Sequence, residues 1–287
     1  MRLPGDSEGG LLYICATPIG NLEDITLRVL RVLQEVDLIA AEDTRETRKI
    51  LSHYSIKTRL TSYHEHNKAR KSAEILNQVA AGAKIALVSD AGLPGISDPG
   101  TELVQAAIAR GLAVTVLPGP VAFATALVLS GLPTEAFAFE GFLPRQKSQR
   151  REALERLAQE PRTVILYEAP HRLRETLHDL EQALGERQAA VLREMTKIHE
   201  EVRRGTLASL SEHFQREEPR GEITLVIGGR TRRRERAPVQ PEDLVRMVRG
   251  KEAEGLPRKE AIRLVSRDMA LPRRQVYQAM LREEGKT

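Results

Sequence analysis

The sequence has no tryptophan and a single cysteine, Cys15, among its 287 residues. One cysteine can form neither a disulfide within the chain nor a zinc site made of several thiolates. Because Cys15 lies inside an apolar run, we expect it to pack as a small hydrophobic side chain rather than to act as a nucleophile.

Long hydrophobic runs are also absent, since no stretch approaches the roughly 18 apolar residues that a membrane helix needs. Residues 1–10 are polar and contain glycines without a hydrophobic signal core, so we expect a disordered start and a cytoplasmic protein with no membrane partner. With 41% hydrophobic and 29% charged residues, the chain can fill the cores of two globular domains.

Two common nucleotide-binding motifs and a common metal motif are missing. No predicted strand is followed by Gly-x-Gly-x-x-Gly, and neither Gly-x-x-x-x-Gly-Lys-Ser/Thr nor His-Glu-x-x-His occurs. His64 and His66 flank Glu65 and would share one face of a strand, but no third ligand follows at a matching spacing. We therefore expect no metal site there.

The most informative segment runs from Ser89 to Gly100 and reads Ser-Asp-Ala-Gly-Leu-Pro-Gly-Ile-Ser-Asp-Pro-Gly. The apolar run before it, 84–88, predicts a buried strand, and residues 101–110 predict a helix that ends at Gly111. A bend rich in glycine and proline exposes backbone N–H and C=O groups after a strand, as the small-molecule sites of open α/β sheets do.

A second bend, Pro118-Gly119-Pro120, follows the next apolar run, 112–117. Two such bends after strands of one sheet predict a shared pocket. Asp90 stands at the strand end, where its carboxylate could meet a ribose or an ammonium group. The next helix opens with small residues, 121–126, which would let a flat ligand approach the backbone.

Strand and helix patterns alternate in the first part of the chain, which predicts an α/β domain over residues 11–131. The expected strands are Leu11–Ala16, Asp37–Ala41, Arg59–Ser62, Lys84–Val88 and Leu112–Leu117. The expected helices are Leu27–Gln34, Arg45–Tyr54, Arg70–Ala81 and Thr101–Arg110. Asp98-Pro99 has the pattern of a helix cap followed by proline.

The pattern changes after Gly131 and predicts a second α/β domain over residues 132–229, with a mixed rather than a purely parallel sheet. Its expected strands are Phe137–Phe142, Thr163–Tyr167, Ala189–Arg193 and Glu222–Ile227, and its expected helices are Gln146–Gln159 and His171–Leu184. The helix Ala122–Leu129 could belong to either domain.

The last part of the chain is basic. From Arg230 to Thr287 there are 16 Lys and Arg against 9 Asp and Glu, whereas the preceding residues have 28 against 31. Residues 230–241 predict a charged linker, and 242–287 a helical module in which Leu-Pro-Arg-Lys (256–259) recurs as Leu-Pro-Arg-Arg (271–274). Two short helices with cationic starts are typical of helix-turn-helix modules that bind nucleic acids, or of a plain helical hairpin packed on the body.

Several motifs together resemble the tetrapyrrole-methylase-type (class III) methyltransferase family. The motifs are Leu12 to Asp24, Ala41 to Arg45, Ser89 to Gly100, Pro118 to Pro120, Tyr167 to Arg172, Arg193 to Lys197 and Gly221 to Val226. They follow the family's order across residues 11–229. The resemblance implies two α/β domains with a cofactor cleft between them.

Within the family, the motifs are most similar to the branch that methylates ribosomal RNA. This resemblance implies transfer of a methyl group from S-adenosylmethionine to the 2′-hydroxyl of a cytidine in the decoding centre of 16S ribosomal RNA. The implied partners are 16S ribosomal RNA or the small ribosomal subunit, and a second copy of the chain in a homodimer. Motif by motif, the implied cofactor-binding residues are Pro18, Asp90, Gly92, Pro94, Gly95, Ile96, Pro118, Gly119, Val121, Ala122, Tyr167, Glu168, Ile223 and Thr224.

A ribose hydroxyl is a weak acid that a nearby carboxylate can assist as a general base. Asp43 and Glu65 follow strands that should end near the Asp90 loop, so they and Arg45 are the candidate catalytic residues, although an aspartate there often only caps a helix. Candidate RNA-binding cations, which could equally form ion pairs, are Arg48, Arg172, Lys197, Arg232, Arg233, Arg234, Arg258, Lys259, Arg273 and Arg274.

Two other functions remain open at this point. A C-methylase of a tetrapyrrole would share the cofactor, but the basic tail and the Glu-Asp-Thr-Arg and Tyr-Glu-Ala-Pro-His-Arg motifs favour RNA. A non-catalytic regulator that binds nucleic acid through the tail would leave the two Gly/Pro bends unexplained. Methyl transfer to RNA, to a porphyrinoid or to neither distinguishes the three functions.

Overall fold

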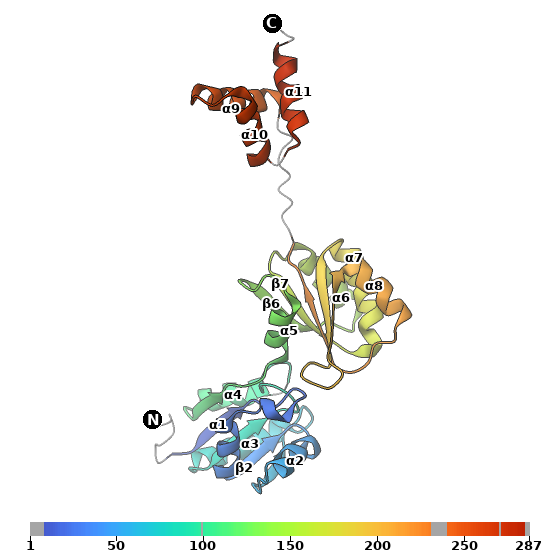
Figure 1. Cartoon of the computed structure of the whole chain (residues 1–287). Helices are drawn as coiled ribbons and strands as arrows, with labels where there is room; N and C mark the ends of the chain where they lie inside the picture. Colours follow the sequence, from blue (N-terminus) through green and yellow to red (C-terminus); the bar gives the residue numbers. More distant parts are fainter. Residues whose placement is uncertain (1–8, 99, 231–239, 270, 285–287) are drawn as a thin grey trace. The chain divides into compact units, whose positions relative to one another are not determined.

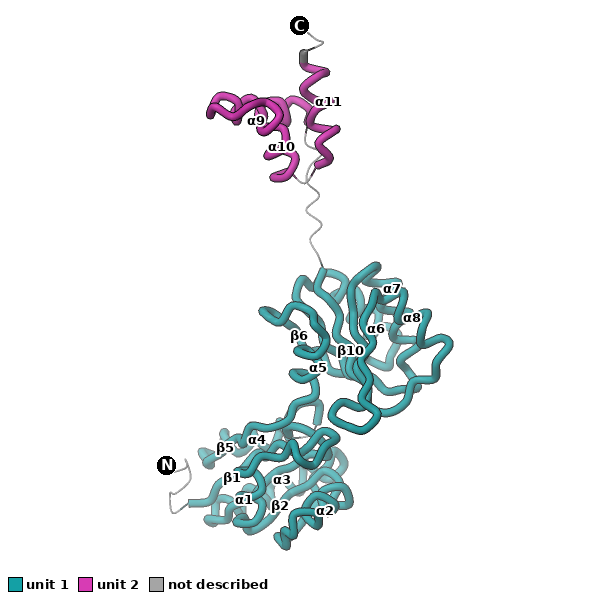
Figure 2. Tube along the Cα trace, in the orientation of Figure 1, with its two compact units in different colours: residues 1–230 teal, residues 231–287 magenta. Residues whose placement is uncertain are grey.

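The structure is a computed structural model that describes residues 9–98, 100–230, 240–269 and 271–284. It divides into two compact units, residues 1–230 and residues 231–287, which Figure 2 shows in different colours. Unit 1 holds two five-stranded sheets. No helix among the described residues is long and apolar enough to span a membrane.

The first sheet of unit 1 is entirely parallel and confirms the predicted α/β pattern. Its strands are β1 (Leu11–Cys15), β2 (Leu38–Ala41), β3 (Leu60–Ser62), β4 (Lys84–Val88) and β5 (Ala113–Leu117), in the order β3-β2-β4-β1-β5 (Figure 1). Its helices are the 3-10 helix η1 (Leu22–Asp24), α1 (Leu27–Glu35), α2 (Thr44–His53), α3 (Lys68–Ala80) and α4 (Gly100–Ala109). Each expected strand and helix is present, with ends that differ by at most two residues.

Both faces of the first sheet are buried, as its apolar strands require. Tyr13 and Cys15 on β1 pack with Val29 of α1 in one cluster, to which α2 also contributes. Leu12 and Ile14 point to the opposite face and pack in a second cluster with residues of α3 and α4. A strand covered on both sides needs a continuous apolar sequence, which explains why β1 reads Leu-Leu-Tyr-Ile-Cys.

The second sheet is mixed, as predicted. Its strands are β6 (Phe137–Phe142), β7 (Thr163–Glu168), β8 (Gln188–Arg193), β9 (Glu201–Thr206) and β10 (Ile223–Ile227), in the order β6-β7-β10-β8-β9. Only β6 and β7 run parallel; the other pairs are antiparallel. Its helices are α5 (Ala122–Ser130), α6 (Lys147–Gln159), the 3-10 helix η2 (Pro170–Arg172), α7 (Leu173–Leu184) and α8 (Leu207–Arg216).

Helices cover this second sheet on both faces. Residues of α6, α7 and α8 form a cluster with one face of the sheet (Figure 1). On the other face, Leu127 of α5 packs with Ile165 and Leu192. Because α5 packs on the second sheet, it belongs structurally with that sheet, although it precedes the expected domain boundary at Gly131.

Apart from the short 3-10 helix η1, one strand and one α-helix of unit 1 were not expected from the sequence. The strand β9 reads Glu-Val-Arg-Arg-Gly-Thr and lies at the edge of its sheet. Edge strands are often polar, and this sequence lacks the apolar pattern by which a strand is recognised. The helix α8 begins where the Thr206 hydroxyl accepts the Ser209 N–H at 3.2 Å, and it buries Leu207, Leu210 and Phe214. That apolar spacing is helical and could have been recognised.

Unit 2 consists, among its described residues, of α9 (Pro241–Ala253), α10 (Arg258–Asp268) and α11 (Arg273–Glu284). The helices α10 and α11 begin at the two repeated Leu-Pro motifs, but α9 was not expected. The three helices share a core of their own, which includes Val248, Val265 and Val276. Unit 2 therefore has a hydrophobic core of its own.

Parts of three predictions fall on residues that the structure does not describe. Residues 1–8 of the expected disordered start, Pro99 of the expected helix cap and residues 231–239 of the expected linker lie outside the described residues. Arg230, at the start of the expected linker, belongs to unit 1, and its N–H donates to the carbonyl oxygen of Glu160 at 2.6 Å.

Candidate active site

The loops that follow β1 and β4 are joined by backbone hydrogen bonds. The N–H of Thr17 donates to the carbonyl oxygen of Gly92 at 2.8 Å, and the N–H of Gly92 donates back to Thr17 at 3.0 Å. The hydroxyl of Thr17 also donates to the carbonyl oxygen of Ser89 at 3.0 Å. These bonds hold the two loops together at the carboxyl edge of the first sheet, where α/β sheets bind ligands.

The predicted Gly/Pro bend is fixed by its own polar groups. One carboxylate oxygen of Asp98 accepts the N–H of Gly95 at 2.6 Å and the N–H of Gly100 at 2.9 Å. Gly92 and Gly95 have φ angles of 79° and 92°, in the left-handed region that favours glycine. The backbone conformation therefore favours glycine at these two positions of the bend.

The second bend lies against the first strand and leads into α5. A Cβ atom on Gly119 would lie 2.8 Å from the Cβ of Ala16, so glycine allows the loop after β5 to pack on the end of β1. The chain then enters α5, where the N–H of Phe123 donates to the Tyr167 hydroxyl at 3.2 Å. This bond connects the bend with β7 of the second sheet.

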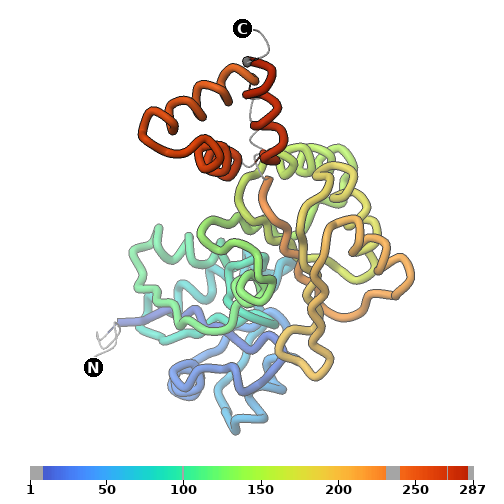
Figure 3. Tube along the Cα trace, turned by 45° about the horizontal axis from the view of Figure 1, so that its top comes forward, coloured from blue at the N-terminus to red at the C-terminus, as the bar shows by residue number. Residues whose placement is uncertain are grey.

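A loop of the second sheet reaches the same edge. Figure 3 shows the segment between β8 and β9 extending toward the N-terminal part of unit 1. The N–H of Asn21 donates to the Thr196 hydroxyl at 3.1 Å. A Cβ on Gly20 would lie 2.8 Å from the carbonyl oxygen of Met195, so this contact is close.

These loops enclose a pocket of 360 Å³ between the two sheets. Its volume falls in the range of small-molecule sites, and apolar side chains and loop backbone form most of its wall. The lining residues are Ile19, Ala91, Gly92, Leu93, Ile96, Val121, Ala122, Phe142, Tyr167, Glu168, Ala169, Pro170, Met195, Gly221, Glu222, Ile223 and Thr224.

The pocket brings together eight of the candidate cofactor-binding residues: Gly92, Ile96, Val121, Ala122, Tyr167, Glu168, Ile223 and Thr224. The other six do not line it: Pro18, Asp90, Pro94, Gly95, Pro118 and Gly119. Asp90 precedes Ala91, and Pro18 precedes Ile19, so both lie directly beside lining residues. Their role as ligands remains a prediction.

Several apolar residues of the pocket were not predicted, and three of them come from different parts of the fold. Ile19 comes from the loop after β1, Phe142 from the end of β6, and Met195 from the loop after β8. Ile19 and Met195 lie inside two of the family motifs, Leu12 to Asp24 and Arg193 to Lys197. Neither has a polar side chain that would mark it as a candidate ligand contact. Phe142 is 53% exposed and lies on the pocket wall.

Glu168 is a buried carboxylate in the wall of the pocket. Its two oxygens accept the N–H of Ala169 at 2.8 Å and the hydroxyl of Thr176 at 2.5 Å. The same hydroxyl accepts a hydrogen bond from Arg150 at 2.9 Å. These bonds fix the orientation of Glu168 from behind the pocket.

Three carboxylates meet where β2 and β4 end. A carboxylate oxygen of Asp90 accepts the N–H of Asp43 at 2.9 Å, and Glu42 lies 3.5 Å from the N–H of Asp90. Burial raises the pKa of Glu42, and the nearby charge of Asp90 adds to the shift. Burial also raises the pKa of Asp90. Glu42 was not among the candidate residues, although it precedes Asp43 in a quoted motif.

Asp43 is the N-cap of α2 and pairs with Arg45. Its carboxylate accepts the backbone N–H of Arg45 at 2.8 Å and forms an ion pair with the guanidinium at 2.6 Å. The hydrogen bond from the Arg45 side chain lowers the pKa of Asp43 to about 2. Asp43 is therefore a weak base. Glu65, the third candidate catalytic residue, is exposed and pairs with Lys68 at 2.8 Å.

The candidate RNA-binding cations of unit 1 have different surroundings. Arg48 is exposed on α2. Arg172 is largely buried, and its guanidinium donates to the carbonyl oxygen of Leu143 at 3.0 Å. Lys197 forms ion pairs with Glu194 at 3.0 Å and Glu222 at 3.3 Å.

The candidate cations of unit 2 are exposed where the structure describes them. These residues are Arg258, Lys259, Arg273 and Arg274. Arg232, Arg233 and Arg234 lie outside the described residues.

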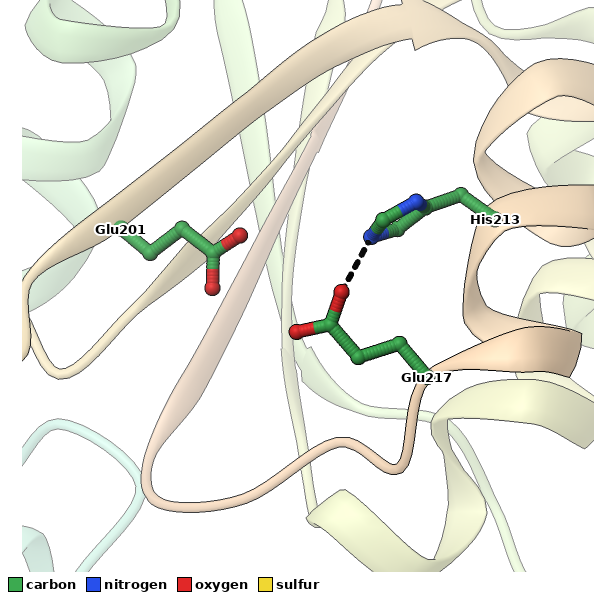
Figure 4. A group of neighbouring side chains, drawn as sticks. All are labelled: Glu201, His213 and Glu217. Carbon is green, nitrogen blue, oxygen red and sulfur yellow. Dashed lines mark ion pairs between the residues drawn. The ribbon is translucent and has the colours of Figure 1, made fainter.

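A group of side chains with metal-ligand chemistry lies away from the pocket, on β9 and at the end of α8 (Figure 4). In it, His213 pairs with Glu217 at 2.9 Å. Arg193 lies 2.9 Å from Glu201 and 3.6 Å from Glu217, and Arg203 lies 2.6 Å from Glu201. Because the two guanidinium groups already neutralise these carboxylates, the group is an ion-pair network.

Comparisons with known proteins give a consistent picture. Residues 11–211 match the family of Tetrapyrrole (Corrin/Porphyrin) Methylases. The chain is 51% identical to the Ribosomal RNA small subunit methyltransferase I of Halalkalibacterium halodurans over 271 residues, which are 93% of each chain. It is 50% identical to the protein of the same name from Synechocystis over 277 residues, or 96% of this chain and 99% of that protein.

Solved structures share the fold at low sequence identity. The cobalt precorrin-4 methyltransferase CbiF is 16% identical with a TM-score of 0.60, covering 79% of this chain and 98% of that one. Uroporphyrin-III C-methyltransferase from Thermus thermophilus, in a complex with S-adenosyl homocysteine, is 20% identical with a TM-score of 0.55, covering 76% and 97%.

Proposed function

Because the chain belongs to the tetrapyrrole (corrin/porphyrin) methylase family, we propose that it transfers the methyl group of S-adenosylmethionine to ribosomal RNA of the small subunit. The observation that carries this proposal is the identity of 51% over 93% of both chains with a ribosomal RNA small subunit methyltransferase I. We propose the 2′-hydroxyl of a cytidine in the decoding centre of 16S ribosomal RNA as the acceptor, on the basis of the resemblance of the motifs.

The pocket between the two sheets is the proposed cofactor site. It has room for a folded small molecule, its wall is largely apolar, and Gly92 and Ala122 leave backbone accessible on the first-sheet side. Thr224 and Tyr167 would contact the ligand from the second sheet. When bound, S-adenosylmethionine would supply a methyl group on a positively charged sulfur. The role of the chain would be to hold the acceptor oxygen about 3 Å from the methyl carbon and in line with the carbon–sulfur bond.

Enclosure by two sheets suits this reaction because it orients the acceptor and excludes water. The loop that carries Met195 contacts the first sheet through the Asn21–Thr196 hydrogen bond. The Phe123–Tyr167 bond joins the sheets on another side. We infer that these contacts fix the distance across the pocket, on which the transfer rate depends.

We keep Asp43, Arg45 and Glu65 as proposed acceptor-side residues, with a specific role for the first two. Because the pKa of Asp43 is about 2, it would act by orienting Arg45 rather than by accepting a proton. The Arg45 guanidinium is exposed and would bind a phosphate of the RNA. A carboxylate with a raised pKa, Glu42 or Asp90, is the better candidate for a base.

The two other functions considered above are less well supported. Two tetrapyrrole-modifying enzymes of known structure, a uroporphyrin-III C-methyltransferase and CbiF, are 24% and 16% identical to the chain, so they support the fold and not the substrate. A non-catalytic RNA-binding protein would not need a formed pocket beside the Gly/Pro bends.

We further propose a cytoplasmic homodimer. At the β5 edge of the first sheet, Val116 of β5 is 50% exposed, and Ile108 of the neighbouring helix α4 is 65% exposed. An edge strand with apolar side chains is a site for association with a second chain. Sedimentation at increasing protein concentration tests this: a mass of one chain at all concentrations would reject the dimer.

Methyl transfer tests the proposed reaction. The purified chain is incubated with tritiated S-adenosylmethionine and small ribosomal subunits that lack the modification, and in parallel with free 16S ribosomal RNA and with a porphyrinoid. We expect label in the RNA of one of the first two samples. Label in the porphyrinoid alone would support C-methylation instead.

A further inference from the structure

The helix α11 of unit 2 buries one side and exposes the other. Val276, Ala279 and Met280 pack in the core of unit 2. The α11 outer face is the name we give to a set of its exposed residues, Arg273, Arg274, Tyr277, Gln278, Leu281 and Arg282. Helical periodicity places Arg273, Tyr277 and Leu281 in one row and Arg274 and Arg282 in the adjacent row.

The cations of the α11 outer face differ from most of those on the other two helices of unit 2. In α9 and α10, four cations form ion pairs close in sequence: Arg246 with Asp243, Lys251 with Glu254, Arg263 with Glu260 and Arg267 with Asp268. By contrast, Arg273, Arg274 and Arg282 form no ion pair with any residue that the structure describes. The guanidinium groups of these three arginines therefore have no carboxylate partner among those residues, although α11 ends with the acidic residues Glu283 and Glu284.

Two of these arginines do not stabilise their own helix. Arg273 and Arg274 are the first residues of α11, at the end where the helix dipole is positive. A cation there is unfavourable, whereas an acidic residue would be favourable. Their presence is better explained by an interaction with an anion than by the stability of the helix.

The same face exposes an aromatic ring. Tyr277 is 51% exposed and Leu281 is 47% exposed, beside the row of arginines. Nucleic-acid bases stack on exposed aromatic rings, and arginine binds the phosphates between them. The major groove of double-stranded RNA is too narrow for side chains to read, so such a face matches unpaired nucleotides.

We propose that the α11 outer face binds an unpaired stretch of RNA, with Tyr277 stacking on a base and Arg273 and Arg274 contacting phosphates. This inference rests on the proposed function in assuming that the substrate is RNA. It assigns the contact to one helix face of the basic tail and adds stacking to the charge attraction.

The first test compares two pairs of arginines in the full-length chain. Binding of a fluorescein-labelled, unstructured RNA oligonucleotide of mixed sequence is followed by fluorescence anisotropy at several salt concentrations. Arg273→Ala/Arg274→Ala should weaken binding at least tenfold, and the slope of log K against log salt should become shallower by about 0.7 for each lost phosphate contact. Arg246→Ala/Arg249→Ala removes the same charge from α9 and should change binding less than threefold.

Misfolding is a poor explanation for the first result. Alanine is the best helix former, and removal of cations from the N-terminal end relieves an unfavourable interaction with the dipole. The melting temperature of Arg273→Ala/Arg274→Ala should be unchanged or higher. Equal losses of binding in the two double variants would overturn the assignment to α11.

The second test separates stacking from charge. Tyr277→Ala should weaken RNA binding about tenfold without changing the salt slope, and Tyr277→Phe, which keeps the ring, should bind like the wild type. A Tyr277→Ala variant with wild-type affinity would overturn the stacking contact. Preferential binding of duplex DNA, or a change in sedimentation mass in these variants, would reject unpaired RNA as the occupant.

Failure of this inference is distinguishable from failure of the proposed function. The α11 variants should bind S-adenosylhomocysteine in calorimetry as the wild type does, because unit 1 holds the pocket. If methyl transfer to RNA occurs but the α11 variants bind RNA normally, only the inference is wrong. If no transfer occurs but the binding pattern is as expected, only the proposed function is wrong.

Discussion

The hydroxyl oxygen of Tyr167 accepts a hydrogen bond from the backbone N–H of Phe123, with 3.2 Å between the two atoms. The donor lies in the first turn of α5, where a backbone N–H has no partner within the helix. Tyr167 lies on β7 and lines the pocket, so one hydrogen bond joins the second sheet to the bend that follows β5. Burial raises the pKa of Tyr167 further above its ordinary value, so the hydroxyl is protonated throughout the neutral range.

Tyr167→Phe should weaken the binding of S-adenosylhomocysteine about fivefold, because loss of a hydrogen bond costs about 1 kcal/mol and loosens the start of α5. Isothermal titration calorimetry measures the affinity. Tyr54→Phe is the matched control, since its hydroxyl donates to the carbonyl oxygen of Leu22 at 2.7 Å and it does not line the pocket. Equal affinities of both variants and the wild type would show that the Tyr167 bond does not organise the site.

Gly92→Ala should lower cofactor affinity by tenfold or more. The φ angle of 79° strains any side chain by about 1 kcal/mol, and a Cβ would lie 3.5 Å from Ile19 on the pocket wall. Gly82→Ala introduces similar strain at a φ of 102°, with no atom within 4 Å of the new Cβ. Both variants should lose similar stability in thermal melts, but only Gly92→Ala should lose affinity. If both variants lost cofactor affinity, backbone strain would be the cause of the loss rather than the position of Gly92 in the pocket.

Asp43→Asn should lower the single-turnover rate of methyl transfer while leaving cofactor affinity nearly unchanged, because a neutral amide at this position cannot hold the Arg45 guanidinium by an ion pair. Glu160→Gln is a suitable control: Glu160 also pairs with an arginine two residues later, Arg162, which lowers its pKa to about 2. The control should keep the wild-type rate. A drop in affinity without a drop in rate would place Asp43 on the cofactor side.

The pH dependence of the same variant tests the role of Asp43 further. Since its pKa is lowered from 3.8 to about 2, its charge favours the folded chain above about pH 4, and this contribution is lost as the pH falls toward 2. Asp43 is therefore ionised throughout the neutral range. Any decline of the rate between pH 7 and 5 should persist in Asp43→Asn; disappearance of that decline would identify Asp43 as the base.

Cys15 should be unreactive in the folded chain. It is fully buried on β1, and burial raises the pKa of its thiol to about 12. Ellman's reagent should therefore label it only as fast as β1 becomes exposed by unfolding, and labelling should be complete within the mixing time in denaturant. Rapid labelling under native conditions would contradict the burial of this strand.

The sequence predicted the first sheet well, because its strands are apolar runs bounded by glycine and proline. The polar edge strand β9 could not be recognised in this way, since only its pairing with β8 makes it a strand. The helix α9 was also missed, although Pro241 starts it and Leu244, Val245 and Val248 give it a buried side. These apolar residues have helical spacing, but they follow the charged linker so closely that no helix was predicted there.

The candidate site was predictable where backbone conformation dictates the residue, as at Gly92. The site was less predictable where partner residues, some of them distant in sequence, or burial set the pKa and the contacts of a side chain. Asp43 and Glu42 are adjacent carboxylates, but the partner Arg45 lowers the pKa of the first and burial raises the pKa of the second. Met195 reaches the pocket only because its loop contacts the first sheet, which no local pattern shows.

The position of the transferred methyl group tests the central claim most directly. After incubation of unmodified small subunits with the chain and tritiated S-adenosylmethionine, the RNA is digested to nucleosides and the labelled nucleoside is identified by chromatography and mass. We expect one labelled species, a 2′-O-methylcytidine, and much less of it with Gly92→Ala at low cofactor concentration. Label on a base, on another ribose, or in no RNA at all would contradict the central claim.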